Sequence, residues 1–225
     1  MALTPRTDWD PQAWKGPAFE RLREVLIAFE QDQEWPSVER INALLRARML
    51  AALGDHAPQF EEQKTNPKRR REKVRRTAGD LYDGHIQMRL RIPTRACNWH
   101  DFFNACVWAW LPRAKQALSA RQFAAASERV PASFVALPPT RSKEQDALAL
   151  LDEGGVLQVG MGAELIFGHA LLEHLVTSKE RVRGFGVPVA CDGETTSVLD
   201  ACLARALEDR AWPPRDASPA VWIAP

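Results

Sequence analysis

Cysteine is sparse in this chain, and no two cysteines form a Cys-x-x-Cys pair. The four cysteines are Cys97, Cys106, Cys191 and Cys202. Their spacing excludes the usual zinc knuckles and gives no disulfide framework, so we expect reduced and mostly buried thiols. A nucleophilic cysteine needs a base within hydrogen-bond reach, and no sequence pattern indicates one.

Long apolar runs are also absent. No stretch approaches the roughly 18 consecutive apolar residues of a membrane-spanning helix. The first ten residues lack the basic start and apolar run of a secretory signal. We therefore expect a cytoplasmic protein that does not interact with a membrane.

An excess of one charge is missing as well. The net charge is +1 although 26% of the residues are charged, so no global feature indicates a nucleic-acid-binding or disordered acidic protein. With 225 residues and 45% hydrophobic content, the chain can bury one substantial core. We expect a single globular domain at 18–212, preceded by an arm at 1–17 that its tryptophans pin down, and followed by a proline-rich tail at 213–225.

The apolar periodicity predicts the secondary structure. Helical spacing or capping residues indicate helices at 18–31, at 38–53 behind the N-cap Ser37, at 99–111 behind Asn98, at 163–176 and at 195–210. Strands are predicted at 82–94 and 187–190, and a hairpin around a glycine turn at 146–159. The expected fold class is α+β: a helix-rich single domain with a small β-sheet and a central apolar helix.

Positive charge gathers in one segment, residues 64–76, which hold eight basic residues and a single acid. Lys68, Arg69, Arg70 and Arg71 can neutralise phosphates, so nucleic-acid binding is one hypothesis. Aromatic residues are absent from the run, which disfavours stacking of single-stranded bases. The alternative is a solvated surface loop over 63–78.

The segment from Arg95 to Arg113 sets polar residues among five aromatic ones. His100, Asp101 and Asn104 are the polar members, and His100 and Asn104 share one helix face because they lie four residues apart. A buried polar group without a partner costs roughly 1–3 kcal/mol. The segment is therefore expected to build either a satisfied polar network or a site.

Further polar residues in apolar surroundings follow later in the chain. Asp152 and Glu153 precede two glycines, and His169 and Glu173 share a helix face four residues apart. His174 is rotated by about 140° from His169, so these two histidines are no shared-face metal pair. Arg95, Arg113 and Lys115 complete the set of embedded polar positions.

Four blocks of sequence occur in an order and spacing that is typical of one family. They are Trp35-Pro-Ser with Ile41-Asn-Ala-Leu-Leu45; Thr94-Arg95 with Asn98-Trp-His-Asp-Phe-Phe-Asn-Ala-Cys-Val-Trp108 and Pro112-Arg-Ala-Lys115; Asp146-Ala-Leu-Ala-Leu-Leu-Asp-Glu-Gly-Gly-Val156; and Phe167-Gly-His-Ala-Leu-Leu-Glu173. With them, residues 35–225 resemble an uncharacterised bacterial family, the domain of unknown function 3025. The family has no established activity, so the resemblance implies candidate positions and no mechanism.

The chain also departs from the family's pattern. Asp83 and His85 stand where the family more often has Glu and Arg, and His174 stands where Lys is common. A segment rich in Trp and charged residues, which the family tends to carry before the Gly-His block, is shortened here to a few residues around Gly160.

Three functions remain open on this evidence. The first is a metal-dependent hydrolase, because two histidines and several carboxylates match the ligands of divalent zinc or manganese. His100 and His169 are then the predicted metal ligands, one carboxylate is the base, and the catalytic candidates are His100, Asp101, Asn104, Asp152, Glu153 and Glu173. The second is a non-catalytic binding or scaffold protein with a small-molecule or protein partner, in which these residues are structural. The third is a nucleic-acid-associated protein or nuclease that uses the basic run.

Overall fold

The computed structural model describes residues 8–63, 77–130, 140–160, 163–178, 180–193, 195–213 and 220–223. The basic run at 64–76, with Lys68, Arg69, Arg70 and Arg71, lies outside these residues, as do the first part of the arm and most of the tail. No helix in the described part of the chain is long and apolar enough to cross a membrane.

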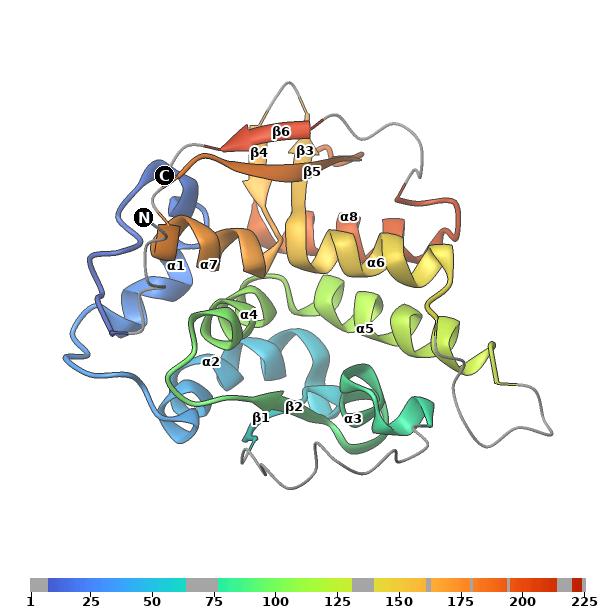
Figure 1. The fold of residues 1–225 in the computed structure, drawn as a ribbon, viewed down its shortest axis with the longest axis horizontal. Coiled ribbons are helices and arrows are strands. Elements are labelled where there is room, and N and C mark those ends of the chain that lie inside the picture. Colours follow the sequence, from blue (N-terminus) through green and yellow to red (C-terminus); the bar gives the residue numbers. More distant parts are fainter. Residues whose placement is uncertain are drawn as a thin grey trace.

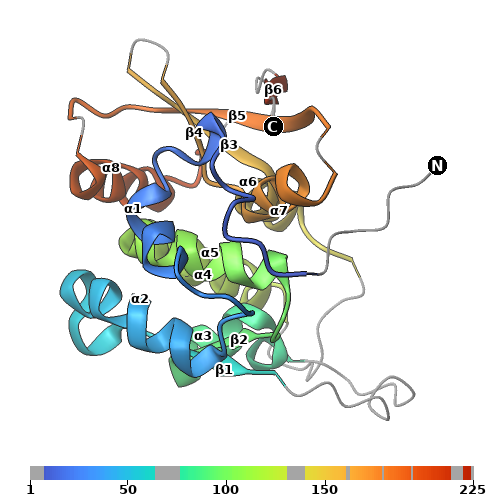
Figure 2. The ribbon, with the colours of Figure 1, turned by 90° about the vertical axis from the view of Figure 1, so that its left-hand side faces the viewer.

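The elements form stacked layers (Figures 1 and 2). A sheet of four strands lies at the top, with α6, α7 and α8 beneath it; α4 and α5 form the middle; α2, α3 and a pair of short strands lie at the bottom. In chain order the elements are η1 (Pro17–Phe19), α1 (Arg23–Leu26), η2 (Ile27–Phe29), α2 (Val38–Leu53), η3 (Gly54–His56), β1 (Gln59–Glu62), η5 (Ala78–Asp80), α3 (Tyr82–Arg89), β2 (Arg91–Thr94), α4 (Trp99–Trp110), α5 (Pro112–Ser127), α6 (Lys143–Gly154), β3 (Gly155–Val159), β4 (Ala163–Ile166), α7 (His169–Ser178), β5 (Val182–Val189), α8 (Thr196–Glu208) and β6 (Ala220–Ile223). The predicted α+β class, helix-rich with small sheets, is confirmed.

The larger sheet has the strand order β4-β3-β5-β6. The inner strands β3 and β5 are parallel, with Gly155 opposite Phe185, while β4 and β6 pair antiparallel at the two edges. Between β3 and β5 the chain forms β4 and α7, so α7 belongs to the crossover that parallel strands require. The smaller sheet is the parallel pair of β1 and β2.

Helix α4 is the central helix that the sequence predicts. Ten of its twelve residues are buried, and Asn98 caps its start by accepting a hydrogen bond from Asp101 N at 3.0 Å. Trp9 of the arm stacks on Trp99 with ring centroids 5.2 Å apart, and Trp14 is buried against Phe102. The arm tryptophans therefore hold the described part of the arm to the body of the protein.

The predicted strand at 82–94 is wrong over most of its length. Residues 82–89 form α3, and only Arg91–Thr94 are extended, as β2. The alternation from Ile86 to Ile92 misleads because Met88, in its middle, is 66% exposed. Helix α3 can pack closely on η5 because Gly84 has no side chain: a Cβ there would lie 2.3 Å from Ala78 O. Leu90 ends the helix in a left-handed conformation with φ 53°.

The predicted hairpin at 146–159 is also wrong. Its first half is the end of helix α6, which starts at a capping box between Ser142 and Gln145. The glycines at 154 and 155 mark the change from α6 to β3 and not a turn between strands. The predicted helix at 163–176 is correct only from His169 onward, because residues 163–166 pair with β3 as β4.

Other predicted elements differ in extent. The segment predicted as one helix at 18–31 consists of the short helices η1, α1 and η2. The predicted strand at 187–190 is the end of the longer β5. Helices α2 and α8 are confirmed, with side-chain caps from Ser37 and Thr195.

Candidate functional site

A pocket of about 470 Å³ lies between the middle layer and the helices under the sheet. It is lined by residues of α3, α4, α5, α6 and α7, among them His100, Asn104, Asp152, Glu153 and His169. With Asp101, six of the predicted site residues, some of them far apart in sequence, therefore meet around one cavity.

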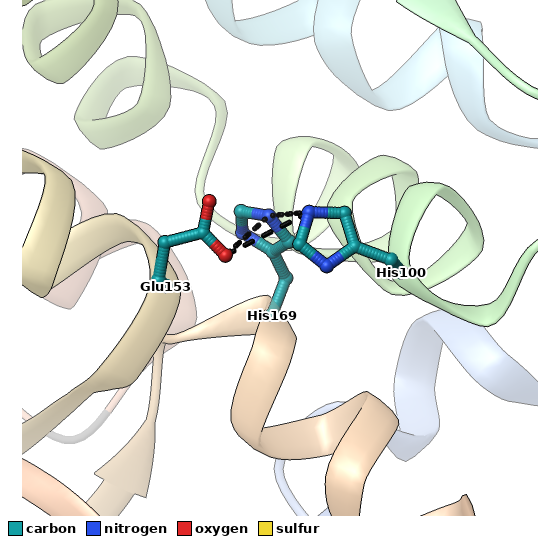
Figure 3. Close-up of side chains that lie close together, drawn as sticks. All are labelled: His100, Glu153 and His169. Carbon is teal, nitrogen blue, oxygen red and sulfur yellow. Dashed lines mark hydrogen bonds and ion pairs between the residues drawn. The ribbon is translucent and has the colours of Figure 1, made fainter. Parts of the chain in front are cut away.

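Three of these side chains converge on one point (Figure 3). His100 Nε2 lies 3.0 Å from His169 Nε2. Glu153 Oε2 lies 3.7 Å from His100 Nε2 and 3.6 Å from His169 Nε2. The three residues come from the start of α4, the end of α6 and the start of α7, and we call them the triad.

Close backbone contact brings two members of the triad together. Gly168, just before His169, lies against the end of α6, where a Cβ would be 2.6 Å from Glu153 O and from Gly154 N. The Gly168 N–H donates to Gly155 O at 2.9 Å. Only glycine allows this approach, so the Gly-His and Asp-Glu-Gly-Gly sequences position His169 beside Glu153.

His100 is oriented by a carboxylate on α7. Its Nδ1 lies 3.0 Å from Glu173 Oε2, and the hydrogen bond to Glu173 raises the pKa of His100 in spite of partial burial. A proton held on Nδ1 by this bond leaves a lone pair on Nε2, which faces the triad centre. Glu173 therefore acts on the site through His100.

His169 has different surroundings. Its side chain is only 4% exposed, and burial lowers its pKa to about 3, so the ring is neutral at ordinary pH. Its Nδ1 has no hydrogen-bond partner in the described structure, but Asp152 Oδ1 lies 3.7 Å away. Asp152 also pairs with the buried Lys115. Burial works to raise the pKa of Asp152, but Lys115 and His169 together bring it below its ordinary value.

The atoms that face one another at the triad are of the kinds that bind metal ions. Two imidazole nitrogens and one carboxylate oxygen face each other at 3.0–3.7 Å. Tetrahedral zinc with bonds of about 2.0–2.1 Å separates its ligand atoms by ~3.4 Å. The three atoms thus have the types and separations of a group that could hold a divalent cation, and all three residues line the pocket.

The remaining predicted positions are not part of the triad. Asp101 and Arg95 also line the pocket and form a bidentate pair at 2.8 and 2.9 Å. Arg113 is exposed. Asp101 Oδ2 also accepts a hydrogen bond from Arg95 N at 2.6 Å.

Two pocket residues were missed as candidates, Tyr82 and Asp83 at the start of α3. Asn104 Nδ2 donates to Tyr82 Oη at 2.6 Å. Burial raises the pKa of Asp83 to about 7. One signal for Asp83 was present in the sequence, its departure from the family's usual Glu, but the predicted strand did not place it in a site.

Comparisons with known proteins give a resemblance to one family over part of the chain and no function. Residues 70–166 match the family model described as Protein of unknown function (DUF3025), so the resemblance to this uncharacterised family is confirmed. The match contains His100, Asn104, Asp152 and Glu153 and ends just before His169. No curated protein and no solved structure matches the chain.

Proposed function

We propose that this protein is a metal-dependent hydrolase whose triad binds one divalent cation, zinc or manganese. The observation that carries the proposal is the convergence of His100 Nε2, His169 Nε2 and Glu153 Oε2 within 3.0–3.7 Å at the wall of a pocket. Three protein ligands with a fourth position left open are typical of catalytic rather than structural zinc sites.

A bound divalent cation supplies Lewis acidity and an activated water, the usual requirements of acyl or phosphoryl hydrolysis. The residues of the chain prepare the site for it. Glu173 fixes the Nδ1 proton of His100, and Asp152 holds the corresponding side of His169. Such outer partners orient metal ligands and increase their basicity. Lys115 balances the charge of Asp152, so this carboxylate supports a ligand and does not bind the metal itself.

Among the predicted catalytic carboxylates, the geometry separates the roles. Glu153, whose side chain is 49% exposed, reaches the triad centre and becomes a third ligand. Asp152 and Glu173 become positioning residues, and Asp101 has no contact with the triad. In the scaffold alternative the same bonds only stabilise the fold. Nucleic-acid binding by residues 68–71 stays a prediction from the sequence.

Metal content tests the proposal directly. The protein is purified without an affinity metal, and its metal is measured by mass spectrometry for the parent, His100→Ala, His169→Ala and His174→Ala. We expect about one divalent ion per chain in the parent and in His174→Ala, whose exposed histidine lies on the same helix as His169. The ion should be lost from the other two. A metal-free parent that also fails to bind added zinc or manganese contradicts the proposal and supports the scaffold alternative.

Catalysis and orientation need separate measurements. Protein loaded with zinc or manganese is tested on chromogenic carboxylic and phosphoric esters, with His169→Ala as the blank. For Glu173→Gln we expect a 10- to 100-fold weaker metal affinity, the usual effect of removing an outer partner. Glu164→Gln, on the exposed side of β4, is the matched control. Equal metal affinity in both variants would show that Glu173 does not support the metal site.

A further inference from the structure

The pocket has a second polar wall that the triad does not use. It consists of Tyr82 and Asp83 from α3 and Asn104 from α4, all of which line the cavity. Asn104 lies one helical turn after His100 on the same face of α4, which separates their Cβ atoms by about 5–6 Å. A small molecule bound at the triad therefore reaches this wall.

Asn104 carries an unused hydrogen-bond acceptor. The residue is 6% exposed, and its amide nitrogen donates to Tyr82 Oη at 2.6 Å. Its Oδ1 is buried and has no partner among the residues that the structure describes. A buried acceptor left in this state costs roughly 1–3 kcal/mol, which a ligand with a donor recovers.

Asp83 supplies a carboxylate beside this acceptor. Turned so that its nitrogen faces Asp83, the Gln122 amide donates to the two carboxylate oxygens at 3.0 and 3.1 Å, and Ser119 adds a hydrogen bond. The nearby cation, Lys115, is paired with Asp152, whose charge also acts on Asp83. Arg95, Arg129 and Arg141 also line the pocket, but in the described structure no lysine or arginine forms an ion pair with Asp83, so no direct ion pair compensates its charge.

An uncompensated carboxylate and an unused amide oxygen on one wall favour a ligand that carries donors and positive charge. We propose that Tyr82, Asp83 and Asn104 form a subsite for the ammonium group of the substrate. This substrate assignment rests on the proposed hydrolase function. Because Asn104 lies one helical turn from His100, the substrate's ammonium group should lie only a few bonds from the bond that is hydrolysed. Amino-acyl amides and esters with a free amino group meet this description.

Tyr82 is the only tyrosine in the chain, so it reports on the subsite alone. Protein labelled with tyrosine isotopically enriched at Cζ gives one NMR signal from this ring. The metal is first removed with a chelator, and the protein is titrated at pH 7 with L-alaninamide, whose amino group is mostly protonated. The control probe is N-acetyl-L-alaninamide, which has the same amide and lacks the ammonium.

We expect a saturable shift of the Tyr82 signal with L-alaninamide and none with the acetylated probe. Asp83→Asn and Asn104→Ala should each weaken the apparent affinity roughly tenfold, the loss expected when one bond to a charged group is removed. His174→Ala should leave it unchanged. The two subsite variants lie on different helices, so one remains informative if the other does not fold.

The outcomes separate this inference from the proposed function. Equal shifts with both probes, no shift with either, or parent-like affinity in folded Asp83→Asn and Asn104→Ala would overturn the subsite. A shift that depends on the ammonium and on both residues supports it, even if the triad binds no metal. If the triad binds metal but the two probes do not differ, the hydrolase proposal stands and the substrate with a free amino group is rejected.

Discussion

The two faces of helix α4 differ in what surrounds them. On one face Trp99, Phe102 and Phe103 are at most 3% exposed and pack against other rings at centroid distances of 4.6–6.0 Å. On the other, His100 and Asn104 face a pocket, and Asn104 retains an unpaired oxygen. A ring buried in this way stabilises the fold by a few kcal/mol, whereas an unpaired polar atom costs about 1–3 kcal/mol.

This difference shows how one helix combines stability with chemistry. The aromatic face fixes the position of α4, so the polar face does not have to contribute to stability. Groups on the polar face can then keep free lone pairs and bind a ligand, which is typical of functional sites. The comparison predicts that changes on the two faces separate stability from ligand binding.

The largest effect is expected on the aromatic face. Phe102 contacts five other rings, and Phe102→Ala should reduce the free energy of unfolding by about 3–5 kcal/mol through loss of burial and the remaining cavity. Denaturant unfolding of chelator-treated protein measures this change. Metal affinity of the folded fraction should stay close to that of the parent. A large loss of affinity together with a small loss of stability would reverse the roles that we assign to the two faces.

A smaller loss of stability is expected at Gly168, whose close backbone contact with the end of α6 positions His169 beside Glu153. In Gly168→Ala the new Cβ would meet Glu153 O and Gly154 at 2.6 Å and must push His169 from Glu153. We expect a loss of about 1–3 kcal/mol from overpacking and at least tenfold weaker metal binding. Gly154→Ala is the matched control, because its Cβ would meet only Leu150 Cδ1, at 3.9 Å. Equal metal affinity for both variants would show that the contact does not set the triad.

The polar face should also give a change that increases stability. The pKa of Asp83 is about 7 in the folded protein and near 3.8 in the unfolded chain, because burial disfavours its charge. The folded state therefore holds more protons between these values, and its stability falls as the pH rises from about 4 to 7. Lys115, Asp152, Ser119 and Gln122 face this carboxyl group.

Asp83→Asn should remove this pH-dependent loss. Relative to the parent, the variant should gain a few kcal/mol between pH 4 and pH 8, because each pKa unit corresponds to about 1.4 kcal/mol. Unfolding curves of both proteins at the two pH values measure the difference. A difference that does not change with pH would show that Asp83 is charged in the folded protein throughout this range.

The smallest effect is expected at the exposed start of α4. Arg95 is 46% exposed in its side chain, and its backbone N–H still donates to Asp101 when the guanidinium is removed. Arg95→Ala should change the free energy of unfolding by less than about 1 kcal/mol. Thermal unfolding at low and high salt measures it. A loss of several kcal/mol would show that the Arg95–Asp101 pair contributes to stability as much as the aromatic face does.

The sequence predicts elements with local start signals well. Ser37, Asn98 and Thr195 each cap a helix that was expected, because a cap and the apolar stripe behind it depend on neighbouring residues only. The segment before Gly154 was predicted as a strand because its apolar run is short and ends in glycines. Two other features decide its structure. The capping box at Ser142 starts a helix, and β3 pairs with β5, whose Phe185 lies opposite Gly155 and thirty residues later in the sequence.

The site was predictable in composition and not in detail. The pairing of His100 with His169 follows from two blocks of polar residues in apolar surroundings, and the structure brings the two rings together. The adjacent acids Asp152 and Glu153 cannot be told apart by sequence. Only the end of α6 decides that one reaches the triad while the other meets Lys115. Asp101 was included because it lies beside His100, but neighbouring residues on a helix point in different directions.

The backbone contact at Gly168 has a consequence for how the protein folds. Glu153 and His169 lie in adjacent elements, α6 and α7, joined through the antiparallel strands β3 and β4. Their half of the triad can assemble from a short stretch of chain with little loss of loop entropy. His100 is separated from His169 by 69 residues and reaches them only when α4 docks under α7. The three triad atoms are thus complete only when contacts distant in sequence have formed, so a cation that needs all three would bind the folded chain and not a local segment of it.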